Sequence, residues 1–175
     1  DFARDLARYG YTTVRDMGSC YRSGIAVRNA INANILSGPR VLSPGLIITP
    51  TETGNSSFGN LYIEADSTEQ VTAACRRELS EGADFIKYMG TGAFMNKGSE
   101  PGQPIATRRE IEAAIEAAAL KGTYVAVHSH GDSMTKTLIE AGVRTIEHVS
   151  FLSEGTIELL ANSDCTWAIP TSAIL

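Results

Sequence analysis

The sequence predicts an α/β fold and, within that class, part of a TIM-type (β/α)8 barrel. Six strand-like runs alternate with helical patterns along the 175 residues. These runs are nearly continuous in apolar residues, which is typical of a parallel sheet covered by helices. No G-x-G-x-x-G or P-loop motif supports a nucleotide-binding, doubly wound sheet. The spacing alone does not separate a barrel from an open sheet.

Four of the predicted strands share one layout. A helical stretch ends at a glycine, a β-branched or aromatic run follows, and a polar residue lies five or six positions after the glycine. We expect each glycine to take the left-handed conformation that ends a helix. The glycines are Gly10, Gly82, Gly122 and Gly142, and the polar residues are Asp16, Lys87, His128 and His148. Two further strands are predicted at 41–49 and 165–171.

Helical patterns separate these strands. One begins at Ser67 or Thr68, and the next begins at Thr107, where Glu110 completes a capping box. Shorter patterns occupy 132–142 and 153–163. The chain opens within a helical pattern and stops directly after a strand, so we expect residues 1–175 to be the central part of a longer chain.

Composition and charge exclude several classes of protein. An apolar content of 43% suits one globular domain with a core. The net charge of −5, with acids and bases interspersed, argues against a nucleic-acid partner or a polybasic membrane anchor. No run approaches the roughly 20 apolar residues of a membrane span. The three cysteines are widely spaced, so we expect buried free thiols and a reducing cytoplasm rather than a disulfide framework.

The three histidines of the chain are the strongest candidates for chemistry. His128 and His148 follow strand-like runs, and active sites of parallel barrels and open sheets lie at the carboxyl ends of the strands. Two neutral imidazoles on adjacent strands can share a metal ion, most often zinc. His130 projects to the same side as His128 if the strand continues, so it either joins the metal site or contacts the substrate. By the same alternation, Glu147 is expected to point away from the barrel interior and to be structural.

Lys87 is a candidate of a different kind. It ends a buried strand, where an unpaired ammonium is costly. Either a carboxylate pairs with it, or its amine is neutral and modified; a carboxylated lysine is an anionic oxygen ligand that can bridge two metals. Tyr88 is a candidate substrate contact, with the helix layer as its alternative location. Arg15, in another strand, is expected to pair with a carboxylate.

The segments GADFIK, VHSHG and IEHVSF, in this order, resemble the amidohydrolase superfamily. The resemblance points to its imidazolonepropionase-like and Xaa-Pro or Xaa-Arg dipeptidase-like branch and covers essentially the whole chain. It implies a (β/α)8 barrel, of which this chain would supply roughly strands two to seven. It also implies a small-molecule or dipeptide substrate, and it leaves homo-oligomerisation open.

The same resemblance implies a centre of two divalent metal ions, expected to be zinc. Lys87 would be the carboxylated lysine that bridges the ions, and His128 and His148 would be the ligands from strands five and six. His130 would be a catalytic residue that contacts the substrate or intermediate. The implied reaction is attack of a metal-activated hydroxide on a C–N amide bond in a dipeptide, an N-acyl amino acid or a cyclic amide.

The sequence departs from the family pattern at several points. The family places a His-x-His motif on strand one and a general-base aspartate on strand eight, and neither occurs in this chain. After strand three, where relatives often read TGGH, Asn55 lies near the histidine position. We therefore expect the segment alone to bind metal weakly and to be inactive.

Two other readings stay open at this point. In the first, the chain is a non-catalytic α/β domain, regulatory or interacting, whose histidines and Lys87 serve packing and hydrogen bonding. In the second, Lys87 is a Schiff-base nucleophile in a barrel enzyme. That reading leaves His128 and His148 without a role.

Overall fold

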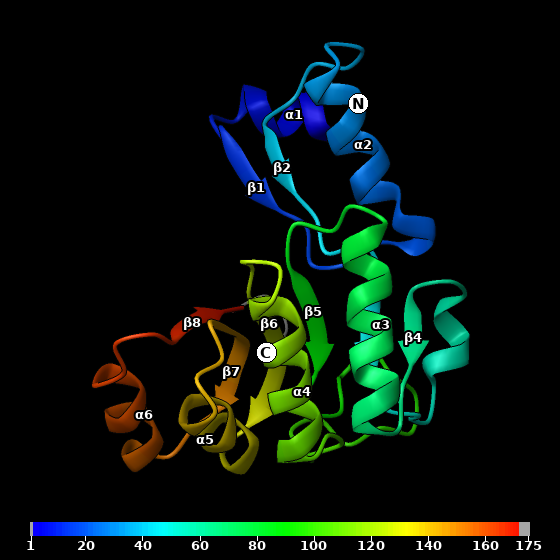
Figure 1. Cartoon of the computed structure of the whole chain (residues 1–175). Coiled ribbons are helices and arrows are strands. Elements are labelled where there is room, and N and C mark those ends of the chain that lie inside the picture. The colour runs from blue at the N-terminus through cyan, green and yellow to red at the C-terminus, as the bar shows by residue number, and fades with distance from the viewer. Residues whose placement is uncertain (1, 172–175) are drawn as a thin grey trace.

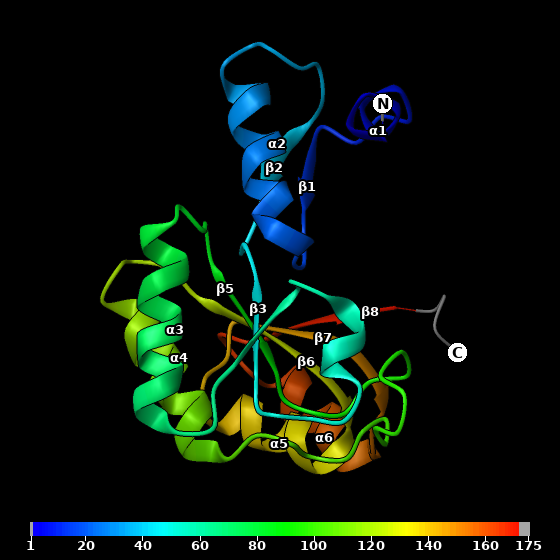
Figure 2. The same cartoon turned by 90° about the vertical axis from the view of Figure 1, so that its right-hand side faces the viewer.

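In the computed structural model, which describes residues 2–171, the chain forms a small sheet and a large sheet. The small sheet pairs β1 (Thr13–Arg15) with β2 (Arg40–Leu42) in parallel, accompanied by α1 (Phe2–Arg8) and α2 (Ser23–Asn32). This unit projects from one end of the molecule and carries the N-terminus (Figure 1; Figure 2).

The large sheet has the spatial order β4-β3-β5-β6-β7-β8 in the described part of the chain, and all its ladders are parallel. Its strands are β3 (Ile47–Thr49), β4 (Tyr62–Glu64), β5 (Ile86–Met89), β6 (Val125–Gly131), β7 (Thr145–Phe151) and β8 (Trp167–Pro170). The helices around it are α3 (Thr68–Ser80), α4 (Arg108–Ala119), α5 (Asp132–Glu140) and α6 (Glu154–Ala161). They cover the outer face of the curved sheet, as a partial (β/α)8 barrel requires (Figure 2). The predicted fold class is confirmed.

The main core lies between the outer face of the large sheet and the helices. Alternate residues of β5, β6 and β7 supply the sheet side of this layer, and the buried faces of α3, α4 and α5 supply the other. The buried residues of these strands in this layer are Ile86, Tyr88, Val125, Val127 and Ile146. The intervening residues of each strand are thereby turned toward the barrel interior.

The segment 41–49 is not the single strand that its composition predicts. It contains the end of β2 and all of β3, and these two strands belong to different sheets. Pro44 lacks an N–H, and the N–H groups of Ser43 and Leu46 donate to the carboxylates of Asp84 and Glu78 instead of to a neighbouring strand. The ladder is therefore interrupted between residues 43 and 46.

The local signals for helix ends are confirmed. The four glycines that precede the strands all have positive φ, with values of 93°, 95°, 69° and 79° in chain order. Ser67 caps α3 through the N–H of Gln70, and Thr107 forms the predicted capping box with Glu110. Helix α2 and strand β4 were not predicted from the sequence.

Three arginines of the N-terminal segment tie the small sheet to the large one. Each forms a salt bridge with a carboxylate more than fifty residues away in the sequence: Arg15 with Glu147, Arg22 with Glu78 and Arg28 with Asp84. The Glu78 side chain is fully buried, and it also accepts from the Leu46 N–H, so its charge has several donors around it. These bonds fix the position of the projecting unit.

All three cysteines are free thiols, but the expectation of burial holds only for Cys75. Cys20 and Cys165 are exposed, because one lies in a short 3-10 turn and the other in the loop before β8. Over residues 2–171, none of the helices combines the length and the apolar character that crossing a bilayer demands.

Candidate metal centre at the carboxyl ends of the strands

Strand alternation places Lys87 and His128 inside the barrel. In β5 the side chains of Ile86 and Tyr88 pack against the helices, so Lys87 and Met89 face inward. Met89 pairs with His128 of β6, which sets the two strands in register. His128 and His130 are two residues apart and project to the same side, as predicted.

The three histidines form one cluster. The ring centroids of His128 and His130, and those of His128 and His148, are 4.6 Å apart, and the His130 and His148 rings stack at 4.7 Å. One nitrogen from each ring can be chosen so that all three atoms lie within 4.8 Å of one another. His128 and His130 are buried and His148 is partly buried. Three nitrogen donors at this separation are a ligand set that zinc and other divalent metals accept.

A local irregularity of β7 brings His148 into this cluster. His148 and Val149 have φ values of 80° and 50°, a left-handed conformation that is rare for residues other than glycine. The register between β6 and β7 shifts at the same point, between Ser129 and Gly131. Backbone conformations of this kind cost about 1–3 kcal/mol and cluster at functional sites. Because the strand is irregular here, two consecutive side chains, Glu147 and His148, both face the barrel interior.

The prediction that Glu147 points away from the interior is therefore wrong. Its carboxylate is buried and accepts two hydrogen bonds from Arg15 Nη2, at 2.9 and 3.1 Å, and one from the Thr145 hydroxyl at 2.7 Å. Arg15 Nη1 donates to Thr145 at 2.9 Å. The prediction that Arg15 pairs with a carboxylate is confirmed, and its partner is the residue expected to face the other way.

Hydrogen bonds fix which nitrogen of each imidazole remains free. His128 Nε2 lies 3.2 Å from the carbonyl oxygen of Gly92. A carbonyl only accepts, so Nε2 carries the proton and the lone pair of Nδ1 is available. His130 Nδ1 bonds to the Ser150 hydroxyl at 2.9 Å, and His148 Nδ1 bonds to the Thr171 hydroxyl at 3.0 Å. In these two rings Nε2 is the nitrogen left for a ligand.

The environment keeps the histidines neutral. Burial lowers the pKa of all three, and the neighbouring Lys87 lowers each further. The pKa of His148 falls to about 4, and that of His128 falls well below its usual range. Neutral imidazole is the form that binds metals, so the site is prepared for a cation near pH 7.

Lys87 lies beside this cluster without a hydrogen-bond partner. Its Nζ is one of three buried side-chain polar atoms that have none among the residues described, with those of Tyr88 and Ser99. Burial lowers the pKa of Lys87 to about 7, against a smaller opposing effect of Glu147, and Arg15 lowers it further. Of the two alternatives that the sequence leaves open, pairing with a carboxylate is not what the structure shows. The remaining one is a neutral amine available for modification.

Lys87 and the histidines open into a cavity of about 300 Å³. Apart from these four residues, its walls are largely apolar and come from the loops after β1, β3 and β5 as well as from the strands. Six of the wall residues are Met17, Ile47, Leu61, Met89, Phe94 and Met95. The Phe94 ring meets His130 edge-on at 4.8 Å. The sequence indicates that the glycine-rich loop after Lys87 is long enough to cover the site, but it does not single out Phe94 or Met95.

Tyr88 and Asn55 lie away from the cluster. Tyr88 is fully buried in the core between the sheet and the helices, so the structure does not bring it to the cavity. Asn55 is buried and donates to the carbonyl of Pro50 and to Glu64, and it accepts from Asn96. Asn55 thereby joins the loop after β3 to the loop after β5.

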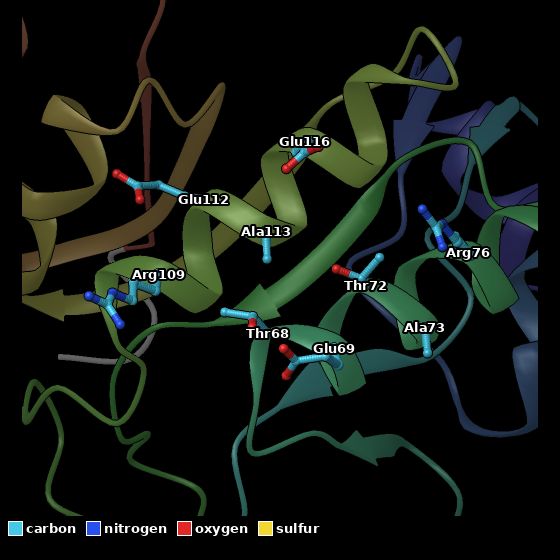
Figure 3. Close-up of a pocket in the computed structure, with 9 residues that line it drawn as sticks. All are labelled: Thr68, Glu69, Thr72, Ala73, Arg76, Arg109, Glu112, Ala113 and Glu116. Carbon is cyan, nitrogen blue, oxygen red and sulfur yellow. The ribbon is translucent and has the colours of Figure 1, made fainter.

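A separate groove of about 590 Å³ runs between α3 and α4 (Figure 3). Both walls carry exposed charges of both signs: Glu69 and Arg76 on α3, and Arg109, Glu112 and Glu116 on α4. None of its residues is buried, and mixed exposed charges of this kind are typical of a solvated helix surface. We therefore place the candidate site at the histidine cluster.

Comparison with known proteins gives a consistent result. All 175 residues match the model of the family described as "Amidohydrolase family". Ochratoxinase from Aspergillus niger is 29% identical over 94% of this chain, and the match covers 38% of that protein. This chain thus spans well under half the length of the curated relative it matches.

Solved structures agree with this match. A Xaa-Pro dipeptidase with bound methionine in its active site superposes with a TM-score of 0.86 at 30% identity, covering 96% of this chain and 44% of that one. A prolidase complexed with N-methylphosphonate-L-proline superposes with a TM-score of 0.84 at 25% identity, covering 97% and 44%. The predicted resemblance of the chain to dipeptidase-like amidohydrolases is confirmed. This chain belongs to the amidohydrolase family.

Proposed function

We propose that this chain forms part of the active site of a metal-dependent hydrolase that cleaves a C–N amide bond. The observation that carries the proposal is the buried, unpaired amine of Lys87 beside three neutral imidazoles. A merely structural lysine would have a carboxylate partner, and structural histidines would not need to meet at one point. The family of the chain and the hydrolytic activities of ochratoxinase and the Xaa-Pro dipeptidase support the same reading.

The residues present fit a divalent metal ion. His128 and His148 offer Nδ1 and Nε2, respectively, and their low pKa values keep these atoms unprotonated at neutral pH. A set of nitrogen and oxygen ligands suits zinc. A bound cation supplies Lewis-acid activation of a water molecule and of the amide carbonyl.

Carboxylation would turn Lys87 into an anionic ligand. The neutral amine adds to the carbon of CO₂, so that an N–C bond forms, one C–O π bond becomes a carboxylate, and a proton leaves the nitrogen for water. The product is a carbamate with two oxygens, in a position where the free amine has no hydrogen-bond partner among the described residues. Such a group can bridge two metals, and ligands for the second would come from outside this chain, since all three of its histidines are already in the cluster.

His130 is the residue that we assign to the substrate. Ser150 holds its Nδ1 and leaves Nε2 facing the site, and the Phe94 ring covers one edge of the imidazole. Because burial lowers its pKa, His130 is neutral before substrate binds and can accept a proton at Nε2.

The substrate class follows from the cavity and from the relatives. Apolar walls favour an apolar group next to the amide, and the dipeptidase and prolidase relatives favour a dipeptide or an N-acyl amino acid over a cyclic amide. The free thiols support a reducing compartment such as the cytoplasm. We expect the isolated segment to bind metal weakly and to lack activity.

The test is metal content in protein expressed from the complete gene with added bicarbonate. We expect about two metals per chain in the parent, and loss of metal in both Lys87→Ala and His148→Ala. Lys121→Ala, which removes an exposed lysine, is the matched control and should keep the metal. A well-folded parent without metal would contradict the proposal.

The unpaired Lys87 amine also favours a second candidate, Schiff-base chemistry. Borohydride reduction in the presence of a carbonyl substrate would then add a stable mass to the peptide that contains Lys87. Metal binding without such an adduct decides for the hydrolase. We rank this candidate second because it gives the histidine cluster no role.

A further inference from the structure

Three aromatic rings meet at the edge of the histidine cluster. The ring centroids of Phe94 and His130 are 4.8 Å apart, those of Phe94 and Phe151 are 6.0 Å apart, and those of His130 and Phe151 are 6.2 Å apart. Phe94 comes from the loop after β5, whereas His130 and Phe151 lie at the ends of β6 and β7. Phe94 and His130 also share the wall of the cavity. Rings from three parts of the chain are thus gathered at one side of the candidate site.

Contacts of the backbone fix the loop that carries the first of these rings. The His130 N–H donates to the Thr91 hydroxyl at 3.1 Å, which ties the start of the loop to β6. A side chain at Gly131 would overlap the Gly102 carbonyl, so the absence of a Cβ lets the end of the loop lie directly on β6. A Cβ at Gly102 would in turn lie 3.3 Å from Cδ2 of the Phe151 ring. The arrangement of the three rings is therefore set by the fold.

Packing of the loop against the sheet does not account for the exposure of two of the rings. Phe94 is 44% exposed and Phe151 is 47% exposed. If their only role were to join the loop to the sheet, burial of both rings would give the larger hydrophobic gain. Two adjacent half-exposed rings instead offer a surface on which a further aromatic ring can lie edge-on or offset.

We propose that Phe94 and Phe151 are specificity-determining residues that select substrates with an aromatic ring next to the scissile amide. This inference rests on the proposed function, in which His130 contacts the substrate, and it narrows the substrate class from apolar to aromatic. A substrate ring seated on Phe94 and Phe151 lies beside His130, so the neighbouring amide is brought to the imidazole.

The physical basis of the preference is the charge distribution of aromatic rings. The edge of such a ring is positive and its face is negative, so two rings in edge-to-face or offset contact attract each other beyond the gain from burying their area. A saturated ring of similar size fills the same space without this attraction. Comparing the two kinds of ring therefore separates recognition by Phe94 and Phe151 from general apolar binding.

A second aromatic pair in the cavity wall provides the matched control. The ring centroids of Phe58 and Tyr62 are 5.6 Å apart, and both residues line the cavity. They come from the segment between β3 and β4 and from β4 itself, and within residues 2–171 neither ring contacts His130. If any aromatic residue of the wall sufficed, loss of Phe58 would weaken the preference as much as loss of Phe94.

The experiment uses protein expressed from the complete gene with bicarbonate and zinc. Alanylphenylalanine and phenylalanylalanine are each compared with the same dipeptide in which cyclohexylalanine replaces phenylalanine. The ratio of the two kcat/KM values is measured, because differences in metal content and in the amount of folded protein cancel in it. We expect a ratio of about 2- to 10-fold in favour of phenylalanine in at least one of the two orders. Phe94→Leu and Phe151→Leu should each bring it close to 1, and Phe58→Leu should keep it.

The outcomes separate this inference from the proposed function. A folded parent without metal contradicts the proposed function, and this inference with it. A parent that binds metal but refuses all four dipeptides, or cleaves them with ratios close to 1, contradicts the inference alone. A preference that survives both Phe94→Leu and Phe151→Leu, or that Phe58→Leu abolishes equally, also contradicts it. Where one of the two leucine variants does not fold, the other decides.

Discussion

Lys87 and Tyr88 are consecutive residues of β5 that face opposite sides of one sheet. Both are buried, and within residues 2–171 neither the Lys87 amine nor the Tyr88 hydroxyl has a hydrogen-bond partner. Tyr88 lies among apolar side chains under α3 and α4, whereas Lys87 faces a cavity that three imidazoles share. An unsatisfied buried polar group therefore does not identify a functional site by itself. What surrounds the group decides whether it is a cost of packing or a reactive group.

The largest effect is expected on the inner face of the sheet, from the substitution Lys87→Met. We expect metal per chain to fall to near zero and kcat/KM on an amide substrate to fall by at least about 10³-fold, because the variant removes a proposed metal ligand. The metal-free variant should nevertheless resist urea better than the metal-free parent. The substitution removes a buried, unpaired amine, and the desolvation of such a group costs about 1–3 kcal/mol of folding free energy. A Lys87→Met protein that retained its metal would place the ligands elsewhere.

On the outer face, Ile86→Ala is expected to lower the free energy of unfolding by about 3 kcal/mol, since it leaves a hole in the packed layer. Metal content measured on the folded protein should not change. Ile86→Val is the matched control, with an expected loss of about 1 kcal/mol. Loss of metal from folded Ile86→Ala would show that the two faces are not independent.

The histidine cluster should give the metal-free protein a specific dependence on pH. The pKa of His148 is about 4 in the folded state and near 6.5 in the unfolded state, so the unfolded state binds more protons between these values. Stability from this residue is therefore present above about pH 6.5 and is lost as the pH falls toward 4, by about 1 kcal/mol per pH unit. Urea unfolding across this range should show the slope, and His148→Gln should reduce it. An equal slope in His148→Gln would assign the effect to other groups.

The smallest effect is expected from Tyr88→Phe. This buried hydroxyl has no partner in the described part of the chain, so its removal should raise the free energy of unfolding by about 1 kcal/mol and leave metal content and activity unchanged. Thermal unfolding and elemental analysis check both points. A marked loss of activity would instead support the predicted contact between Tyr88 and the substrate.

The sequence predicts the alternating elements well because its signals are local. Glycines at helix ends, the caps at Ser67 and Thr107, and polar residues at strand ends require only neighbouring positions. For the same reason Lys87, His128 and His148 could be placed at one edge of the sheet before their distances were known. Alternation from Lys87 also implies that Tyr88 faces the helices, which the structure shows.

The features that were missed depend on residues far apart in the sequence. Segment 41–49 forms two strands because the N–H groups of Ser43 and Leu46 donate to the carboxylates of Asp84 and Glu78. No local sequence pattern predicts those partners. Glu147 alternates inward with respect to Ile146, and His148 also faces inward because its backbone is left-handed, a conformation that the sequence of β7 does not predict. The cavity walls come from loops whose side chains follow no period.

The contact between His128 and the Gly92 carbonyl has a consequence for how such an enzyme can diversify. The acceptor belongs to the main chain, so no side-chain substitution at that position deletes it directly. The same loop presents Phe94 and Met95 to the cavity. New side chains at these two positions can therefore alter which molecules are accepted while the imidazole keeps its tautomer. Within one short loop, the contact that orients the His128 ring is therefore separate from the side chains that line the cavity.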